Sequence, residues 1–300
     1  MAKFICENCK KEYIRKGNLD RHALKCKPSP IQNEINTIED EINTIQSVRN
    51  EDCILGMKKI KDNSVDIVIA DPPYNIGKDF GNDSDRQEMN NYLEWCDSWI
   101  KECIRILKPN GTMYIYGFSE ILAFIRVRIN INVRWIIWHY TNKVTPSLNF
   151  WQRTHESILC CSKEKPKFNR DEVREPYTDN FLNNAAGKVR KATAGRFSNG
   201  ETETKYAAHE NGALPRDVIK LPALAGGAGK KERVNHPTQK PLELCKKLIR
   251  ACKNGDDTLV VIPFAGSGSE CVAAKEENVK FIGFEINQDY VDLCNERLNN

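Results

Sequence analysis

The sequence contains no run of about 18 apolar residues, the length that a transmembrane helix needs. Its first residues, MAKFICENCKKEY, also lack the apolar stretch of a secretory signal. These absences predict a cytoplasmic protein with no membrane partner. The glycine-rich segment GSGSE is not followed by Gly-Lys-Ser/Thr, so a triphosphate site of the P-loop type is not expected.

The 300 residues suffice for one large α/β domain and a small additional unit. Twelve cysteines could form several disulfides, yet most stand singly in apolar segments, where cysteine behaves as a small hydrophobe. We therefore expect reduced core cysteines, with Cys53, Cys103, Cys252 and Cys271 as examples.

Positive charge is concentrated at the N-terminus. Residues 1–30 hold eight Lys or Arg and three Asp or Glu, whereas the whole chain has a net charge of only +4. A second basic stretch, GKVRKATAGR at 187–196, contains four basic residues and no acid. A basic run by itself is usually a solvated loop, but the basic N-terminus predicts an anionic partner.

Four candidate metal ligands occur in FICENCKKEYIRKGNLDRHALKC, with two, twelve and three residues between them. This spacing is typical of a structural zinc site. A unit of this size cannot bury enough surface to fold alone, so zinc would be required for folding. The predicted ligands are Cys6, Cys9, His22 and Cys26.

Residues 4–26 resemble the ββα zinc finger, although Cys26 replaces the more usual final His. The apolar core positions of such a finger match Phe4, Tyr13 and Leu19. The resemblance implies that the base-facing helix residues are Arg15, Asn18 and Arg21. Arginine suits guanine and asparagine suits adenine, which favours a G-A-G-like step. Whether the finger binds DNA or protein stays open.

A connector at residues 29–48 carries isoleucines at alternating spacings of four and three, at Ile31, Ile35, Ile38, Ile42 and Ile45. This pattern predicts a helix with a heptad seam. It covers only about two heptads, fewer than a secure coiled-coil prediction requires. Homodimerisation through the seam and docking of the seam on the same chain are both consistent with it.

Residues 49–300 alternate apolar strands with amphipathic helices. VDIVIA, TLVVIPF and KFIGFE read as buried strands, and YLEWCDSWIKECIRILK and PLELCKKLIRACK read as helices. This alternation predicts a Rossmann-like α/β fold with a mainly parallel sheet covered on both faces. Ligands in such folds bind at the carboxyl ends of the strands.

The segment IVIADPPYNIG places polar groups directly after a buried strand. Pro72 and Pro73 cannot continue a strand ladder, so they would hold the Asp71 carboxylate and the Tyr74 ring in a fixed array. Such an array suits a planar ring that bears an amino group. A simple proline turn explains these four residues about equally well.

A second motif, VVIPFAGSGSECVAA, reads as a strand, a glycine loop and a helix. Gly266 and Gly268 would let the backbone approach a ligand, and the helix N-terminus would offer free amides. Glu285 ends the next strand nineteen residues after Gly266, a distance typical of an acid that binds ribose hydroxyls.

DPPY followed downstream by HPTQKPLEL, PFAGSGS and FIGFE resembles the β-class of S-adenosylmethionine (SAM)-dependent DNA amino-methyltransferases, in which the catalytic motif precedes the cofactor loop. The resemblance spans about residues 48–298. It implies Asp71, Pro72, Pro73 and Tyr74 as catalytic residues. It also implies cofactor contacts from Asp52, Lys240, Phe264, Gly266, Gly268 and Glu285.

The implied reaction acts on double-stranded DNA. A flipped base would stack on Tyr74, and its amine would donate hydrogen bonds to Asp71 and the Pro72 carbonyl, in line with the sulfonium methyl. Members with Asp at the first motif position usually methylate adenine N6, whereas N4 of cytosine is the alternative. A target-recognition region is expected at about 164–234, with DNA contacts from Lys188, Arg190 and Lys191.

Two positions depart from the family pattern. Ile262 stands where the family usually has Asp, and Ser269 and Glu270 stand where two threonines are common. Glu270 could compensate for the missing acid. A DNA-binding regulator that has lost turnover is the rival reading, against which the intact DPPY motif and Glu285 argue.

Overall fold

The computed structural model describes residues 4–6, 11–23, 25–26, 46–80, 85–142, 146–196 and 198–300. Its contacts divide the chain into two units, Met1–Gln46 and Ser47–Asn300, which are described separately. The predicted ligand Cys9 and the five isoleucines of the connector lie outside the described residues. Residues 47 and 48, which the heptad prediction assigned to the connector, belong instead to a strand, because Val48 pairs with Gly283 and is buried.

The N-terminal unit has the strand-strand-helix order of the predicted finger. Strands β1 (Phe4–Ile5) and β2 (Glu12–Tyr13) pair antiparallel, with Phe4 opposite Tyr13, and helix α1 (Lys16–Ala23) follows. The Tyr13 ring lies 5.1 Å from the His22 ring. Cys6 is buried, although this unit is small.

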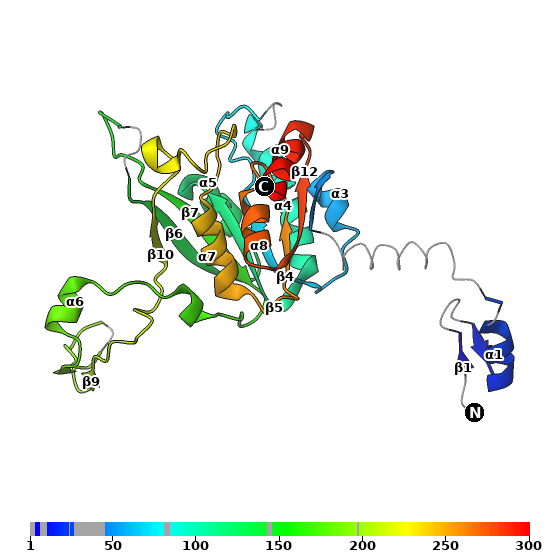
Figure 1. Cartoon of the computed structure of the whole chain (residues 1–300), viewed down its shortest axis with the longest axis horizontal. Coiled ribbons are helices and arrows are strands. Elements are labelled where there is room, and N and C mark those ends of the chain that lie inside the picture. The colour runs from blue at the N-terminus through cyan, green and yellow to red at the C-terminus, as the bar shows by residue number, and fades with distance from the viewer. Residues whose placement is uncertain are drawn as a thin grey trace. The chain divides into compact units, whose positions relative to one another are not determined.

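The second unit is built on an eight-stranded sheet of order β10-β6-β7-β5-β4-β11-β12-β3 (Figure 1). Strand β7 pairs antiparallel with β5 and β6, and all other neighbours are parallel. This confirms the predicted mainly parallel α/β fold. The strands are β3 (Ser47–Asn50), β4 (Val65–Ala70), β5 (Leu107–Gly117), β6 (Asn132–Tyr140), β7 (His155–Ser162), β10 (Val218–Leu221), β11 (Leu259–Ile262) and β12 (Lys280–Glu285).

Helices cover both faces of this sheet (Figure 1). One face is covered by α7 (Leu242–Cys252) and α8 (Ser269–Glu276), and the other by α4 (Met89–Ile106) and α5 (Ser119–Arg126). The remaining elements near the sheet are α3 (Cys53–Met57), α9 (Gln288–Asn299) and the 3-10 turns η2 (Arg170–Val173) and η3 (Gly226–Gly229). Among the described helices, none has the length and apolar character to cross a bilayer.

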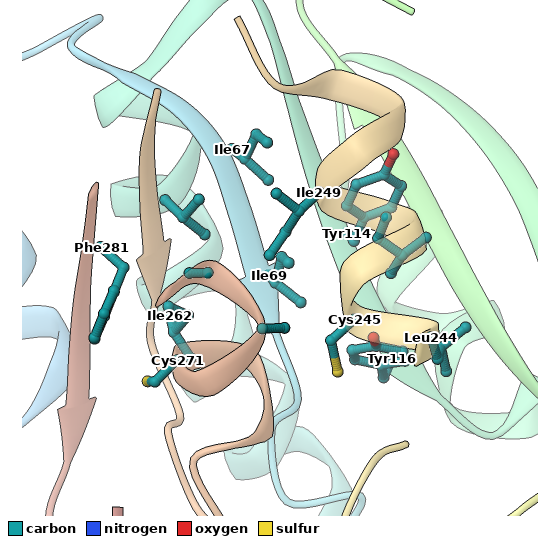
Figure 2. Close-up of a cluster of buried hydrophobic side chains, with 14 of the residues drawn as sticks. Ile67, Ile69, Tyr114, Tyr116, Leu244, Cys245, Ile249, Ile262, Cys271 and Phe281 are labelled. Carbon is teal, nitrogen blue, oxygen red and sulfur yellow. The ribbon is translucent and has the colours of Figure 1, made fainter. Parts of the chain in front are cut away.

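The core lies between α7, α8 and the sheet (Figure 2). Every residue of β4 is buried, and its alternate members Ile67 and Ile69 face α7. Ile262, the departure from the family pattern, is a fully buried member of this core. The nine cysteines of this unit form no disulfide with one another, which agrees with their prediction as core residues.

A lobe between Glu175 and Ala213 leaves the layered body. These two residues close it through paired backbone hydrogen bonds of 3.0 and 2.7 Å. The lobe contains α6 (Asp179–Asn184) and a small sheet of β8 (Val189–Lys191) and β9 (Glu203–Lys205), separate from the large sheet. It falls within the predicted target-recognition region.

Candidate active site

Four adjacent parallel strands bring the predicted residues to one edge of the sheet. Strands β4, β11, β12 and β3 are consecutive in the sheet order, so their carboxyl ends meet there although the chain visits them far apart. Asp71 follows β4, Phe264 follows β11, Glu285 ends β12 and Asp52 follows β3. The order of the motifs along the chain, with DPPY before the glycine loop, is therefore compatible with a single compact site.

A cavity opens at this edge. Its walls include the predicted residues Asp52, Asp71, Pro73, Phe264, Gly266 and Glu285. The Phe264 ring is held by Trp95 and Trp99, whose centroids lie 5.6 and 5.3 Å away. Asp52 also caps α3 by accepting a 3.0 Å hydrogen bond from the Leu55 amide.

The glycine loop is shaped by close packing. Gly266 has φ +47°, and a Cβ there would come 3.0 Å from His236 Nε2. Its amide donates a 2.8 Å hydrogen bond to Glu285, whose carboxylate also accepts from the Asn287 amide at 2.9 Å. Burial raises the pKa of Glu285. Gly268 (φ +78°) precedes α8, where a Cβ would meet Cys294 at 2.8 Å, so its role is in packing rather than in the cavity wall.

Lys240, for which the resemblance implied a cofactor contact, lies beside the DPPY motif and is not among the described residues that line the cavity. Its buried ammonium donates to both oxygens of Asp71, at 2.9 and 2.7 Å, and lies 3.6 Å from Glu156. Burial lowers the pKa of Lys240, but the two carboxylates outweigh this and raise it above its usual range. Burial raises the pKa of Asp71, and the Lys240 ammonium opposes that rise.

Tyr74 is tied into the same network. Its hydroxyl lies 2.8 Å from Asp71 Oδ1 and 3.0 Å from Glu156 Oε2, and can donate to either. Its ring is only 6% exposed and meets the edge of Phe118 at 5.2 Å. A base could therefore stack on this ring only after the ring becomes more accessible.

A shallow hollow lies beside the Tyr74 ring, lined by Pro72, Tyr74, Ile76, Lys78, Phe80, Asp85 and Thr238. Phe80 and Thr238 also line the larger cavity, so the two spaces share a wall. Asp71 and Pro73 face the larger cavity, whereas Pro72 and Tyr74 face the hollow. The catalytic motif thus separates two adjacent spaces.

Sequence reasoning missed two acids that build this motif. Glu156 is the second residue of the antiparallel strand β7, and its Oε1 accepts a 2.6 Å hydrogen bond from Tyr140. Asp85 is 1% exposed and accepts backbone hydrogen bonds of 2.5, 3.2 and 2.6 Å from Asn75, Ile76 and Lys78. An isolated acid at the start of an apolar strand was the available signal for Glu156.

Replacing Asp85 by Asn is expected to loosen the segment after the catalytic motif. An amide has one acceptor oxygen, so its NH₂ group would face backbone N–H donors that the carboxylate now satisfies. We expect a loss of about 1–3 kcal/mol in the free energy of unfolding. Denaturant unfolding of Asp85→Asn, with the exposed Asp257→Asn as control, measures this; equal unfolding midpoints for the two variants would contradict it.

An open, mainly parallel sheet with a glycine loop, an acid at the next strand end and a DPPY motif defines a Rossmann-like methyltransferase. Residues 65–296 match the sequence profile of the DNA methylase family of N6/N4 methyltransferases, and the chain belongs to that family. It is 32% identical over 255 residues to the Type II methyltransferase M.HpaI of Haemophilus parainfluenzae, covering 82% of this chain and 72% of M.HpaI.

Another relative is the DNA adenine methyltransferase YhdJ of Escherichia coli (strain K12). The two are 31% identical over 280 residues, which cover 91% of this chain and 86% of YhdJ. Among solved structures, the PvuII DNA methyltransferase (cytosine-N4-specific) superposes with a TM-score of 0.60 at 18% identity, covering 84% of this chain and 85% of that one. The M1.HpyAVI–SAM complex gives 0.54 at 23% identity, covering 85% and 99%. These structures support the fold.

Proposed function

We propose that this DNA methyltransferase transfers a methyl group from SAM to N6 of adenine in double-stranded DNA. The observation that carries the proposal is that the DPPY motif borders two adjacent spaces, with Asp71 and Pro73 lining the glycine-loop cavity and Pro72 and Tyr74 lining the hollow. A cofactor in the cavity and a base in the hollow would meet at this motif. The 31% sequence identity to YhdJ, a DNA adenine methyltransferase, favours adenine over cytosine as the target base.

The residues that line the cavity suit the chemistry of SAM. Phe264, Phe284 and Ile286 offer apolar walls for an adenine ring, and the Glu285 carboxylate is an acceptor for ribose hydroxyls. The close packing at Gly266 leaves no room for a side chain, so the backbone itself forms that wall. SAM supplies an electrophilic methyl group on a sulfonium. Residues of the chain must then position the nucleophile.

Positioning would be the task of Asp71. A carboxylate that accepts a hydrogen bond from the adenine amine favours the geometry in which the nitrogen lone pair points at the cavity. In the structure, the Lys240 ammonium occupies both oxygens of Asp71. Each carboxylate oxygen can accept a further hydrogen bond, so an amine could bind Asp71 from the cavity side while Lys240 stays paired with Asp71 and lies 3.6 Å from Glu156.

The decisive experiment is mass analysis of nucleosides from DNA treated with the protein and SAM. N6-methyladenine is the expected product. N4-methylcytosine would overturn the choice of base, and no methylated nucleoside would support the rival reading, a regulator that has lost turnover. Sequencing of the modified DNA then identifies the target site.

We also propose that the N-terminal unit binds structural zinc. Ligand atoms of Cys6, His22 and Cys26 lie within 4.8 Å of one another, close to the roughly 3.8 Å that separates ligands around one tetrahedral zinc ion. Cys9, the fourth proposed ligand, would complete the set predicted from the spacing. Arg15, Asn18 and Arg21 are exposed on or beside α1, where they could contact DNA bases.

Elemental analysis of the full chain is expected to find about one zinc ion per molecule. The Cys26→Ser variant should lose most of it and lose protease protection of residues 4–26, because the unit depends on the metal for folding. Cys160→Ser, in the body, is the matched control and should keep the zinc. Equal zinc contents in the wild type and both variants would contradict this site.

Exposed basic side chains of the lobe are proposed DNA contacts. Lys188, Arg190 and Lys191 are all exposed, and Lys191 lies opposite Glu203 in the small sheet.

At the catalytic edge, the β6–β7 hairpin adds exposed apolar residues, with Leu148 at 91%, Phe150 at 80% and Trp151 at 88%. Such side chains can wedge between base pairs when a base is flipped.

The triple variant Lys188→Ala/Arg190→Ala/Lys191→Ala should bind DNA more weakly at low salt. Each lost phosphate contact is expected to reduce the slope of log affinity against log salt by about 0.9. Filter binding over a salt series measures the slope, and Lys101→Ala, an exposed position on α4, serves as the control. An unchanged slope in the triple variant would place the DNA contacts elsewhere.

A further inference from the structure

The cofactor cavity has an excess of acidic groups. None of its described lining residues is Lys or Arg. The lining imidazole, His236, has its pKa lowered to about 4, first by burial and then by Lys240 and Arg297, so it is neutral near pH 7. Five carboxylates line the walls, namely Glu51, Asp52, Asp71, Glu270 and Glu285.

Four of these carboxylates have a cation or backbone amides as partners. Glu51 forms an ion pair with Lys59, and Asp71 forms one with Lys240. Asp52 and Glu285 accept hydrogen bonds from backbone N–H groups, as described above. Their negative charge is therefore partly neutralised within the protein.

Glu270 differs from the other four. It lies in the first turn of α8, is 3% exposed, and belongs to none of the ion pairs within 4.0 Å among the described residues. Its carboxylate has no cation within ion-pair distance in the part of the chain that the structure describes, and it interacts with its own backbone amide and with the Cys245 thiol, a weak donor at 3.5 Å from Oε1. Burial first, and then Asp71, raise its pKa to about 7 against the opposing effect of Lys240.

We propose that Glu270 makes this cavity prefer the cationic sulfonium cofactor over its uncharged thioether product. The inference rests on the proposed function, because it requires SAM to bind here. During transfer the methyl carbon leaves sulfur, the electron pair of that bond stays on sulfur, and the target nitrogen gains the methyl and releases a proton. The cofactor thereby loses one positive charge, which weakens its attraction to an ionised Glu270 and favours product release.

The preference for SAM over S-adenosylhomocysteine should become stronger as the pH rises. Below its pKa Glu270 is neutral and contributes no attraction, whereas above it the carboxylate attracts the sulfonium. Buried thiols and a phenol facing it keep raised pKa values and stay neutral in this range. The titratable and charged groups around Glu270 are Asp71, Tyr116, Lys240, Cys245, Cys271, Cys294 and Arg297.

Calorimetric titration of the full chain with SAM and with S-adenosylhomocysteine, at about pH 6 and about pH 8.5, tests the proposal. We expect the ratio of the two dissociation constants to change about fivefold in favour of SAM at the higher pH, the size expected for one charge acting across a partly screened cavity. A ratio that stays constant in the wild type overturns the proposal without any variant.

Glu270→Gln keeps the shape and removes the charge. In this variant the ratio of the two dissociation constants should be independent of pH. At the higher pH, SAM should bind about fivefold more weakly than to the wild type, and S-adenosylhomocysteine should bind with unchanged affinity. Glu276→Gln, on the exposed side of the same helix, is the control and should behave as the wild type. A pH-dependent ratio in Glu270→Gln would assign the effect to another group. If neither ligand binds the wild type, the proposed function fails as well.

Discussion

Asp71→Ala is expected to lower methyl transfer at least a hundredfold while SAM still binds. The carboxylate would act on the amine of the base, and removal of one acceptor that stabilises the transition state typically costs two to three orders of magnitude. The proposed cofactor contacts at Phe264, Gly266 and Glu285 come from other strand ends and stay in place. Single-turnover transfer of labelled methyl groups, together with calorimetric SAM binding, measures the two effects separately.

The variant also leaves Lys240 without its closer partner, so folding must be checked. Glu156, 3.6 Å from the ammonium, still offers one carboxylate. Thermal unfolding with and without SAM monitors this, and Asp257→Ala at an exposed position serves as the control. Transfer within a few-fold of the wild type would refute the role assigned to Asp71, whereas loss of SAM binding alone would place this residue with the cofactor.

Three central strands of the sheet, β4, β11 and β12, were predictable because they are almost entirely buried. The mostly apolar segments VDIVIA and KFIGFE coincide with β4 and β12, and helices between them favour parallel pairing. The rule that ligands bind at carboxyl strand ends then placed Asp71 and Glu285 at one edge. Asp71 directly follows β4 and Glu285 is the last residue of β12, so their position needs no knowledge of long-range packing.

The partners of the motif were not predictable in the same way. Glu156 reaches the site because β7 runs antiparallel, which places the start of that strand beside the ends of its neighbours. Lys240 meets Asp71 across 169 positions of sequence, through the docking of the segment before α7. Such contacts depend on strand order and helix docking, for which local patterns hold no signal.

Replacement of Lys240 is expected to have the second large effect on methyl transfer. Breaking a buried ion pair by removing one partner leaves an uncompensated charge and typically costs about 3–5 kcal/mol. In Lys240→Met, Asp71 avoids part of this cost by binding a proton, because burial raises its pKa and the opposing ammonium is gone. A protonated Asp71 has lost the charge that would attract an amine donor, so transfer should fall, and complete protonation would cost about the hundredfold that is typical of losing one such group.

The sign of the pH dependence follows from this shift. Without Lys240 the pKa of Asp71 lies higher, so the rise of the transfer rate with pH, which follows the ionised fraction of Asp71, should be displaced to higher pH than in the wild type. A pH profile of kcat/KM for Lys240→Met and Lys240→Arg tests this. Arg keeps the positive charge and should retain the profile of the wild type. SAM affinity should change little in Lys240→Met, because Lys240 lies behind Asp71 rather than in the cavity wall; a large loss of SAM affinity with a normal pH profile would instead restore Lys240 as a cofactor ligand.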